Sequence, residues 1–236
     1  MTSQTCFADA PLGLLHHRPG ELRDRHCHDG AFVAVVLEGG YQEAGDEGRW
    51  NVRPGDALIH HAYESHLDRF EATGARVLVL DLPTRLVATT IVRGHVADPD
   101  SLVRLAERDG RAASDLFGEM FVAATPTALD WPDMLADDLR RLAPFALADW
   151  ADDKGVRPET LSRGFRSAYG CTPKSYRADV RARAAFAAAR LGGEPFIDIA
   201  HRLHFTDQAH MTHAVAGLTG APPGWWRRRQ MDTRQG

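Results

Sequence analysis

Histidines are the residues of this 236-residue chain whose type and spacing most readily suggest chemistry. His26 and His28 are separated by one residue, and His60, His61 and His66 follow further along the chain. Neutral imidazole is a ligand of Zn²⁺ and of other transition ions, and three imidazoles leave one coordination position open. The same side chains could instead line a pocket for an organic molecule or lie on the surface. The sequence leaves a metal site and these alternatives open.

Short strands are expected to carry these histidines. Residues 32–37 are rich in β-branched and aromatic side chains and stop at Glu38-Gly39-Gly40, and residues 76–80 form a second apolar run. Arg53-Pro54-Gly55-Asp56 between them is typical of a turn. Several short strands separated by turns predict a β-sandwich or a β-barrel.

The turn and the strand after it resemble a known barrel. Pro54-Gly55-Asp56, followed by the apolar residues 57–59 and a later histidine, resembles the cupin barrel over about residues 12–82. Cupin enzymes bring a His-x-His pair and a later histidine together on a metal ion inside the barrel. The resemblance therefore implies that a divalent transition metal such as Zn²⁺ is held by His26, His28 and His66.

Two observations restrict this metal hypothesis. Cupin enzymes place a glutamate four or five residues after the pair, where this chain has Phe32 and Val33. Its absence counts against redox or dioxygenase chemistry. Cys27 would point to the opposite face of a strand from His26 and His28, so joint ligation by all three is not expected.

Residues 101–143 change to a helical pattern. Apolar side chains recur at helical spacing, for example at Leu102 and Leu105, and again at Met134, Leu135 and Leu139. We interpret this segment as helices that link two domains. An apolar face left over after packing could form a dimer contact, and simple intramolecular packing is the alternative.

A stretch of about twenty residues occurs twice in the C-terminal third of the chain. Residues 161–165 are followed by Gly170 and Pro173, and residues 211–215 are followed by Gly220 and Pro223. Each copy predicts a short helix, a tight turn and a second helix that stops at glycine. Two helix-turn-helix units, over residues 145–168 and 196–219, are typical of a DNA-binding domain.

At these residues the chain resembles the AraC/XylS family of bacterial regulators. Residues 158–165 resemble the first recognition helix of that family, and the residues from Ile199 to Arg227 resemble its signature around the second unit. Many members also carry a cupin-like effector domain. The family usually has glycine at the position of His204 and arginine at that of His213, so we expect most base contacts from the first unit.

The residues expected to contact DNA lie on the outward faces of the two second helices. Arginine makes bidentate contacts to guanine, and the other side chains could contact phosphate. The predicted DNA-binding residues are Arg157, Glu159, Thr160, Arg163, Arg166, Thr206, Asp207, Gln208, His210, His213 and Arg227.

Charge and composition agree with two different halves. Residues 1–143 have a net charge of −9 and residues 144–236 a net charge of +5, as an acidic front domain and a polyanion-binding domain would. The longest apolar run, residues 31–37, is too short to span a bilayer, and no signal peptide is evident. Three widely spaced cysteines argue against a disulfide framework, so we expect a cytoplasmic protein.

The sequence thus predicts an α+β protein with an N-terminal cupin-like β-barrel, linker helices and an all-α tandem helix-turn-helix domain. The expected divisions are an effector domain at 1–100, a helical segment at 101–143 and a DNA-binding domain at 144–236. We expect a non-enzymatic transcription regulator, controlled by a small-molecule or metal effector, that binds double-stranded DNA as a homodimer and has no membrane partner. RNA polymerase is a further candidate partner. The alternatives are a metal-dependent cupin enzyme with a helical appendage and a DNA-binding protein whose barrel only dimerises.

Overall fold

The computed structural model describes residues 5–7, 10–87, 89–90, 92–124 and 130–235. The chain divides into two compact units, Thr2–Leu129 and Asp130–Gly236. The helices predicted over residues 101–143 are divided between the two units, because α1 (Pro99–Ala106) and α2 (Gly110–Met120) belong to the first unit and α3 (Trp131–Arg140) to the second. The first unit is an antiparallel sheet with helices on it and the second is all-helical, which confirms the predicted α+β class.

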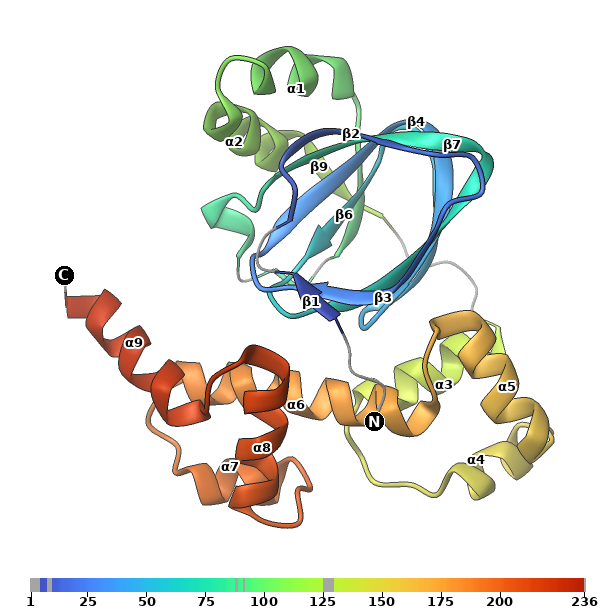
Figure 1. Cartoon of the computed structure of the whole chain (residues 1–236), viewed down its shortest axis with the longest axis vertical. Helices are drawn as coiled ribbons and strands as arrows, with labels where there is room; N and C mark the ends of the chain where they lie inside the picture. Colours follow the sequence, from blue (N-terminus) through green and yellow to red (C-terminus); the bar gives the residue numbers. More distant parts are fainter. Residues whose placement is uncertain (1–4, 8–9, 88, 91, 125–129, 236) are drawn as a thin grey trace. The chain divides into compact units, whose positions relative to one another are not determined.

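A rolled sheet of nine described strands forms the first unit (Figure 1). The sheet order is β1-β3-β7-β4-β6-β8-β9, with β2 on β7 and β5 on β4. All described pairs are antiparallel except β1 with β3. The strands are β1 (Thr5–Phe7), β2 (Gly13–His17), β3 (Leu22–His28), β4 (Phe32–Gly45), β5 (Gly48–Val52), β6 (Asp56–His60), β7 (Ser65–Asp81), β8 (Arg93–Val96) and β9 (Phe121–Ala123).

Two of these strands are much longer than the sequence predicts. β4 continues through Gly39 and Gly40, where the sequence suggests a stop, and β7 begins well before residue 76. The ladder between them bends where its register shifts, after Val36 and again after Gly39, and Gly39 and Gly74 take φ values of +70° and +69°. A Cβ atom on Gly39 would overlap the carbonyl oxygen of Gly74. Glycine therefore bends β4 at the position where the sequence predicts that the strand ends.

The two faces of β4 pack into different cores. Phe32, Ala34 and Val36 face the interior of the rolled sheet, whereas Val33 and Val35 face outward. The outward face is covered by α1 (Pro99–Ala106) and α2 (Gly110–Met120), which lie on one side of the sheet (Figure 1). This alternation sends one set of strand side chains into the interior, where the candidate site lies.

The second unit contains the two predicted helix-turn-helix elements. Its helices are α3 (Trp131–Arg140), α4 (Leu147–Asp153), α5 (Pro158–Tyr169), α6 (Pro173–Leu191), α7 (Phe196–Arg202), α8 (Gln208–Thr219) and α9 (Pro223–Gln235). The pairs α4–α5 and α7–α8 are joined by the long helix α6 (Figure 1). Gly170 and Gly220 end α5 and α8 in the left-handed conformation, as the repeat predicts.

The turns of the two helix-turn-helix elements have the same backbone conformation but are formed by different residues. Gly155 has φ +62° and His204 has φ +58°. A side chain in the left-handed region costs about 1–2 kcal/mol, and glycine avoids this cost while losing more entropy on folding. The turn of the second helix-turn-helix element therefore carries a backbone strain that the turn of the first does not.

Exchanging these residue types is expected to change stability in opposite directions. His204→Gly should raise the free energy of unfolding by about 0.5–1 kcal/mol, and Gly155→Ala should lower it by about 1 kcal/mol. Urea unfolding followed by circular dichroism measures both changes. Destabilisation by His204→Gly would show that the imidazole makes a contact worth more than the strain.

Candidate functional site

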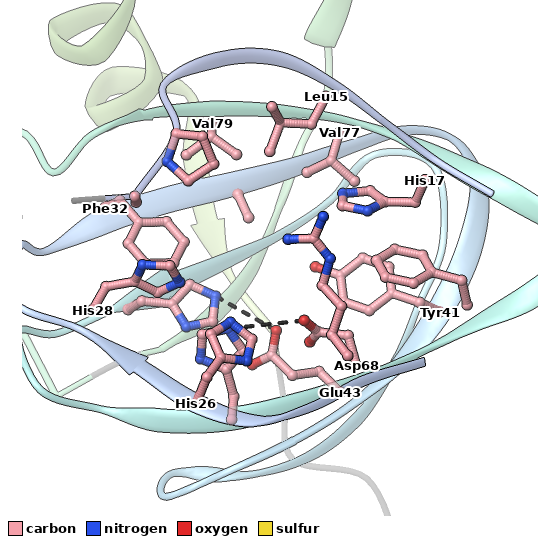
Figure 2. Close-up of a pocket in the computed structure, with 17 residues that line it drawn as sticks. Leu15, His17, His26, His28, Phe32, Tyr41, Glu43, Asp68, Val77 and Val79 are labelled. Carbon is pink, nitrogen blue, oxygen red and sulfur yellow. Dashed lines mark ion pairs between the residues drawn. The ribbon is translucent and has the colours of Figure 1, made fainter. Parts of the chain in front are cut away.

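A pocket opens into the interior of the rolled sheet. Its volume is about 470 Å³, counting the space at its mouth. Leu15, Val77 and Val79 lie at one side of it, and histidine, glutamate and aspartate side chains gather at another (Figure 2). The lining residues are Ala10, Pro11, Leu15, His17, Arg23, His26, His28, Phe32, Ala34, Tyr41, Glu43, His60, His66, Asp68, Phe70, Val77 and Val79.

The three histidines predicted to bind a metal meet in this pocket. His26 and His28 come from β3 and His66 from β7, where it is the register partner of His26. All three are buried, and each offers a ring nitrogen that lies within 4.8 Å of the other two. The ring centroid of His66 is 4.4 Å from that of His26 and 5.7 Å from that of His28. The spacing of His-x-His places both imidazoles on one face of β3 because side chains alternate along a strand.

The chemistry of these three side chains fits a metal ion. Burial lowers the pKa of His26 and of His66, so both rings stay neutral at pH values where an exposed histidine would gain a proton. His26 Nδ1 lies 2.8 Å from the carbonyl oxygen of Asp24, a contact that fixes the ring and leaves Nε2 for a ligand. The buried His66 Nδ1 atom has no hydrogen-bond partner among the described residues. The arrangement can therefore hold a metal ion.

Two carboxylates that the sequence did not single out lie in the same pocket. His60 Nε2 is 3.5 Å from Glu43 Oε2, and His66 Nε2 is 3.9 Å from Asp68 Oδ2 (Figure 2). Burial raises the pKa of Asp68 to about 7 and that of Glu43 well above its ordinary range. A cation beside these groups would favour their ionised forms. Two carboxylates, from β4 and β7, therefore lie beside the histidine rings, although no glutamate follows the His-x-His pair.

A buried ion pair holds the strands that carry the histidines. The guanidinium of Arg25 contacts the carboxylate of Asp46, and the side-chain exposures are 8% and 1%. Asp46 also accepts a hydrogen bond of 2.9 Å from the backbone N–H of Ser65. Arg25 precedes His26 and Ser65 precedes His66, so Asp46 ties the two strands together next to the candidate ligands.

Asp46→Ala is expected to lower the free energy of unfolding by about 3–5 kcal/mol, because it leaves Arg25 buried without this counter-ion. Urea unfolding measures the loss. Glu38→Ala is the control, since it removes an exposed ion pair with Arg76 in the same unit and should cost less than about 1 kcal/mol. Equal losses in the two variants would contradict the role of Asp46.

The side chains predicted to contact DNA are exposed in both helix-turn-helix units, with one exception. Arg157 precedes α5, and Glu159, Thr160, Arg163 and Arg166 lie along it, while Leu161 and Phe165 fill the core. In the second helix-turn-helix element, the predicted residues are exposed at the start of α8 and along it: Thr206, Asp207, Gln208, His210 and His213. Asp207 accepts a 2.7 Å hydrogen bond from the N–H of His210 and thereby caps α8.

The exception is Arg227. Its guanidinium lies 3.7 Å from the ring centroid of Phe196 and donates to the carbonyl oxygens of Ala189 and Glu194, at 3.2 and 2.7 Å. These contacts join α9 to α6 and α7. No local sequence pattern indicates this structural role, because the three partners lie more than thirty residues from Arg227.

Comparisons with known proteins identify both units. A family model described as an AraC-like ligand binding domain matches residues 12–143, more than half of the chain. The chain belongs to the AraC family of transcription regulators. A second model, described as a helix-turn-helix domain, matches residues 150–229 of this AraC-type regulator. The resemblance seen in the sequence is confirmed, and with it an N-terminal ligand-binding domain in front of a DNA-binding domain.

Solved structures of several regulators are similar to the chain, at low identity and low TM-scores. ToxT from Vibrio cholerae has 8% identity and a TM-score of 0.40, over 92% of this chain and 96% of its own. The C-terminal domain of AraT from Geobacillus stearothermophilus has 20% identity and a TM-score of 0.40, over 44% of this chain and 88% of its own. A DNA-binding transcriptional dual regulator from Escherichia coli K-12 has 12% identity and a TM-score of 0.41, over 46% of this chain and 99% of its own. At these scores the neighbours say nothing about what this regulator binds.

No curated protein sequence matches the chain significantly. Among the helices in the described part of the chain, none is long and apolar enough to span a membrane.

Proposed function

We propose that this regulator senses a divalent transition metal ion, such as Zn²⁺, in its N-terminal domain and binds promoter DNA through its two helix-turn-helix units. The convergence of three buried histidines carries the metal part of the proposal. His26, His28 and His66 would each supply one nitrogen. A bound metal would supply an open coordination position for water or a small chelating molecule.

The match to a ligand-binding domain in front of a helix-turn-helix domain favours a sensor over an enzyme. Glu43 and Asp68 lie beside histidine rings in the pocket, but the group of side chains able to share one ion consists of the three imidazoles alone among the described residues. Metal binding would stabilise the strands β3 and β7 against each other, because the ligands come from both. A change in the stability of these strands can shift the population of DNA-competent molecules.

On DNA, α5 would make most of the base contacts. It carries the exposed Arg163 and Arg166 and is preceded by Arg157, whereas α8 has no arginine or lysine. Glu159 and Thr160 would help to read bases, and Thr206, Gln208, His210 and His213 would contact phosphates or base edges from the second unit. Asp207 would contribute by capping α8. Arg227 would take a smaller part in this interface, because its Nε and one terminal nitrogen donate to carbonyl oxygens inside the domain.

The remaining parts of the proposal follow from this assignment. A homodimer would place two copies on paired half-sites, and contact with RNA polymerase would couple binding to transcription. A cytoplasmic location would give the protein access to bacterial DNA.

DNA binding with and without metal tests the proposal. The tightest duplex is first selected from a random-sequence pool with the purified full-length chain, in Zn²⁺ and in chelator. We expect affinity to fall steeply with salt, as counterion release requires, and to differ between the two conditions. If DNA affinity depends on salt but is the same in Zn²⁺ and in chelator, the protein is a DNA-binding regulator whose effector is not the metal. Catalytic turnover by a metal-loaded protein that binds no DNA would favour the enzyme.

A further inference from the structure

Two of the three cysteines, far apart in the sequence, lie side by side in the sheet. β1 and β3 pair in parallel, and Cys6 is the register partner of Cys27. Neighbouring strands lie about 4.8 Å apart, which falls within the Cα separation of about 4.4–6.8 Å that a disulfide bridges. Register partners project to the same face of a sheet. Both cysteines are reduced in the structure.

The two thiols differ in a way that suits stepwise oxidation. Cys6 is exposed, whereas Cys27 is buried with 1% of its surface accessible. The hydrogen bond between the two side chains lowers the pKa of Cys6, and burial opposes this only in part. Because the thiolate is the nucleophile, Cys6 is the thiol that a small oxidant can reach and that is prepared to react.

We propose that Cys6 and Cys27 form a reversible disulfide when the protein meets a peroxide, so that the β1–β3 ladder is a redox-sensitive site. The Cys6 thiolate attacks one peroxide oxygen, the O–O bond breaks, and the departing hydroxide takes a proton to become water. The Cys27 sulfur then attacks the sulfenic sulfur of Cys6, the S–O bond breaks, and the thiol proton of Cys27 leaves with the hydroxide as a second water. Two thiols are oxidised by two electrons and one peroxide is reduced.

The position of Cys27 decides what the bond would constrain. Cys27 lies between His26 and His28 on β3, but it is absent from the pocket lining and faces away from it. The bond would anchor the N-terminal strand on the outer side of the strand that forms the pocket wall. Disulfides of cytoplasmic proteins are usually transient and redox-sensing, so thiols at rest and a bond under peroxide agree with the expected compartment.

Thiol counting on the full-length protein tests the proposal. After treatment with hydrogen peroxide, unfolding and alkylation, wild type should carry one alkylated cysteine in place of three and an intact mass lower by two hydrogen atoms before alkylation. Dithiothreitol should restore all three, and peptide mapping should join Cys6 to Cys27. Cys171→Ser removes the buried cysteine of the other unit and should still form the bond.

Cys6→Ser should keep both of its remaining thiols after the same treatment. The oxidised wild type should also unfold at a higher temperature than the reduced protein, a difference that Cys6→Ser should lose. Three alkylated thiols in treated wild type, a sulfinic acid on Cys6, or a disulfide between two chains would each overturn the proposal.

Discussion

His28→Ala is expected to reduce the metal content of the purified protein from near one ion per chain to near zero. Removing one of three imidazoles leaves two ligands, and the two-ligand site cannot hold the ion against dilution. Mass spectrometry of the untagged protein, with and without added Zn²⁺, measures the stoichiometry. Metal should also stabilise wild type. With Zn²⁺ at a thousand times its dissociation constant, the free energy of unfolding should be about 4 kcal/mol higher than in chelator, and the free energy of unfolding of the variant should be the same in both conditions.

The control for this variant is His16→Ala, which removes an exposed histidine from β2 in the same unit. It should keep the metal content and the chelator response of wild type. If wild type binds no metal at any Zn²⁺ concentration, or if His28→Ala binds as much as wild type, the metal hypothesis is wrong. The pocket would then belong to an organic effector, and the histidines would serve as polar lining.

Arg163→Ala is expected to weaken binding to the selected duplex by about 1–3 kcal/mol, a factor of roughly 5 to 150. Arg163 is exposed on α5, and its neighbours Leu161 and Phe165 fix the helix in the core. A bidentate contact from arginine to guanine would be lost, so sequence preference should relax at one base pair. Titration of labelled duplexes with single base changes, at two salt concentrations, measures both effects.

Arg108→Ala is the matched control, because it removes the same charge from an exposed position in the N-terminal unit. It should change affinity little and leave the base preference intact. A uniform loss across all duplexes for Arg163→Ala, with a smaller salt slope, would assign the side chain to phosphate. Unchanged affinity would remove it from the interface.

The sequence by itself predicted the helical half closely. The predicted helix-turn-helix elements at 145–168 and 196–219 correspond to α4–α5 and α7–α8. Helix boundaries depend on local signals, here an apolar period near four residues, Pro158 in the first turn of α5, and a glycine after the last residue of α5 and of α8. The role of His204 in the turn was also evident, since it occupies the position of Gly155 in the repeat. The meeting of His26, His28 and His66 followed from the cupin resemblance.

Only the tertiary structure placed Glu43 and Asp68 in the pocket. Strand alternation predicts which residues share a face only while the register is unbroken. The register shifts in β4 between Val36 and Glu38 and again between Gly39 and Tyr41. Phe32 and Ala34 therefore share the interior with Tyr41 and Glu43, although these residues differ from them in parity. A bulge causes this change of face, and the sequence pattern does not show where a bulge lies.

Three further features could be seen only in the tertiary structure: the pairing of Cys6 with Cys27, the contacts of Arg227, and the division of residues 101–143 between the two compact units. Each depends on which distant segments lie side by side. Local sequence determined the elements of this regulator because helix caps, turns and apolar periods act within a few residues. Long-range strand register and helix packing decided which side chains meet, because their energies come from contacts between segments that the sequence keeps apart.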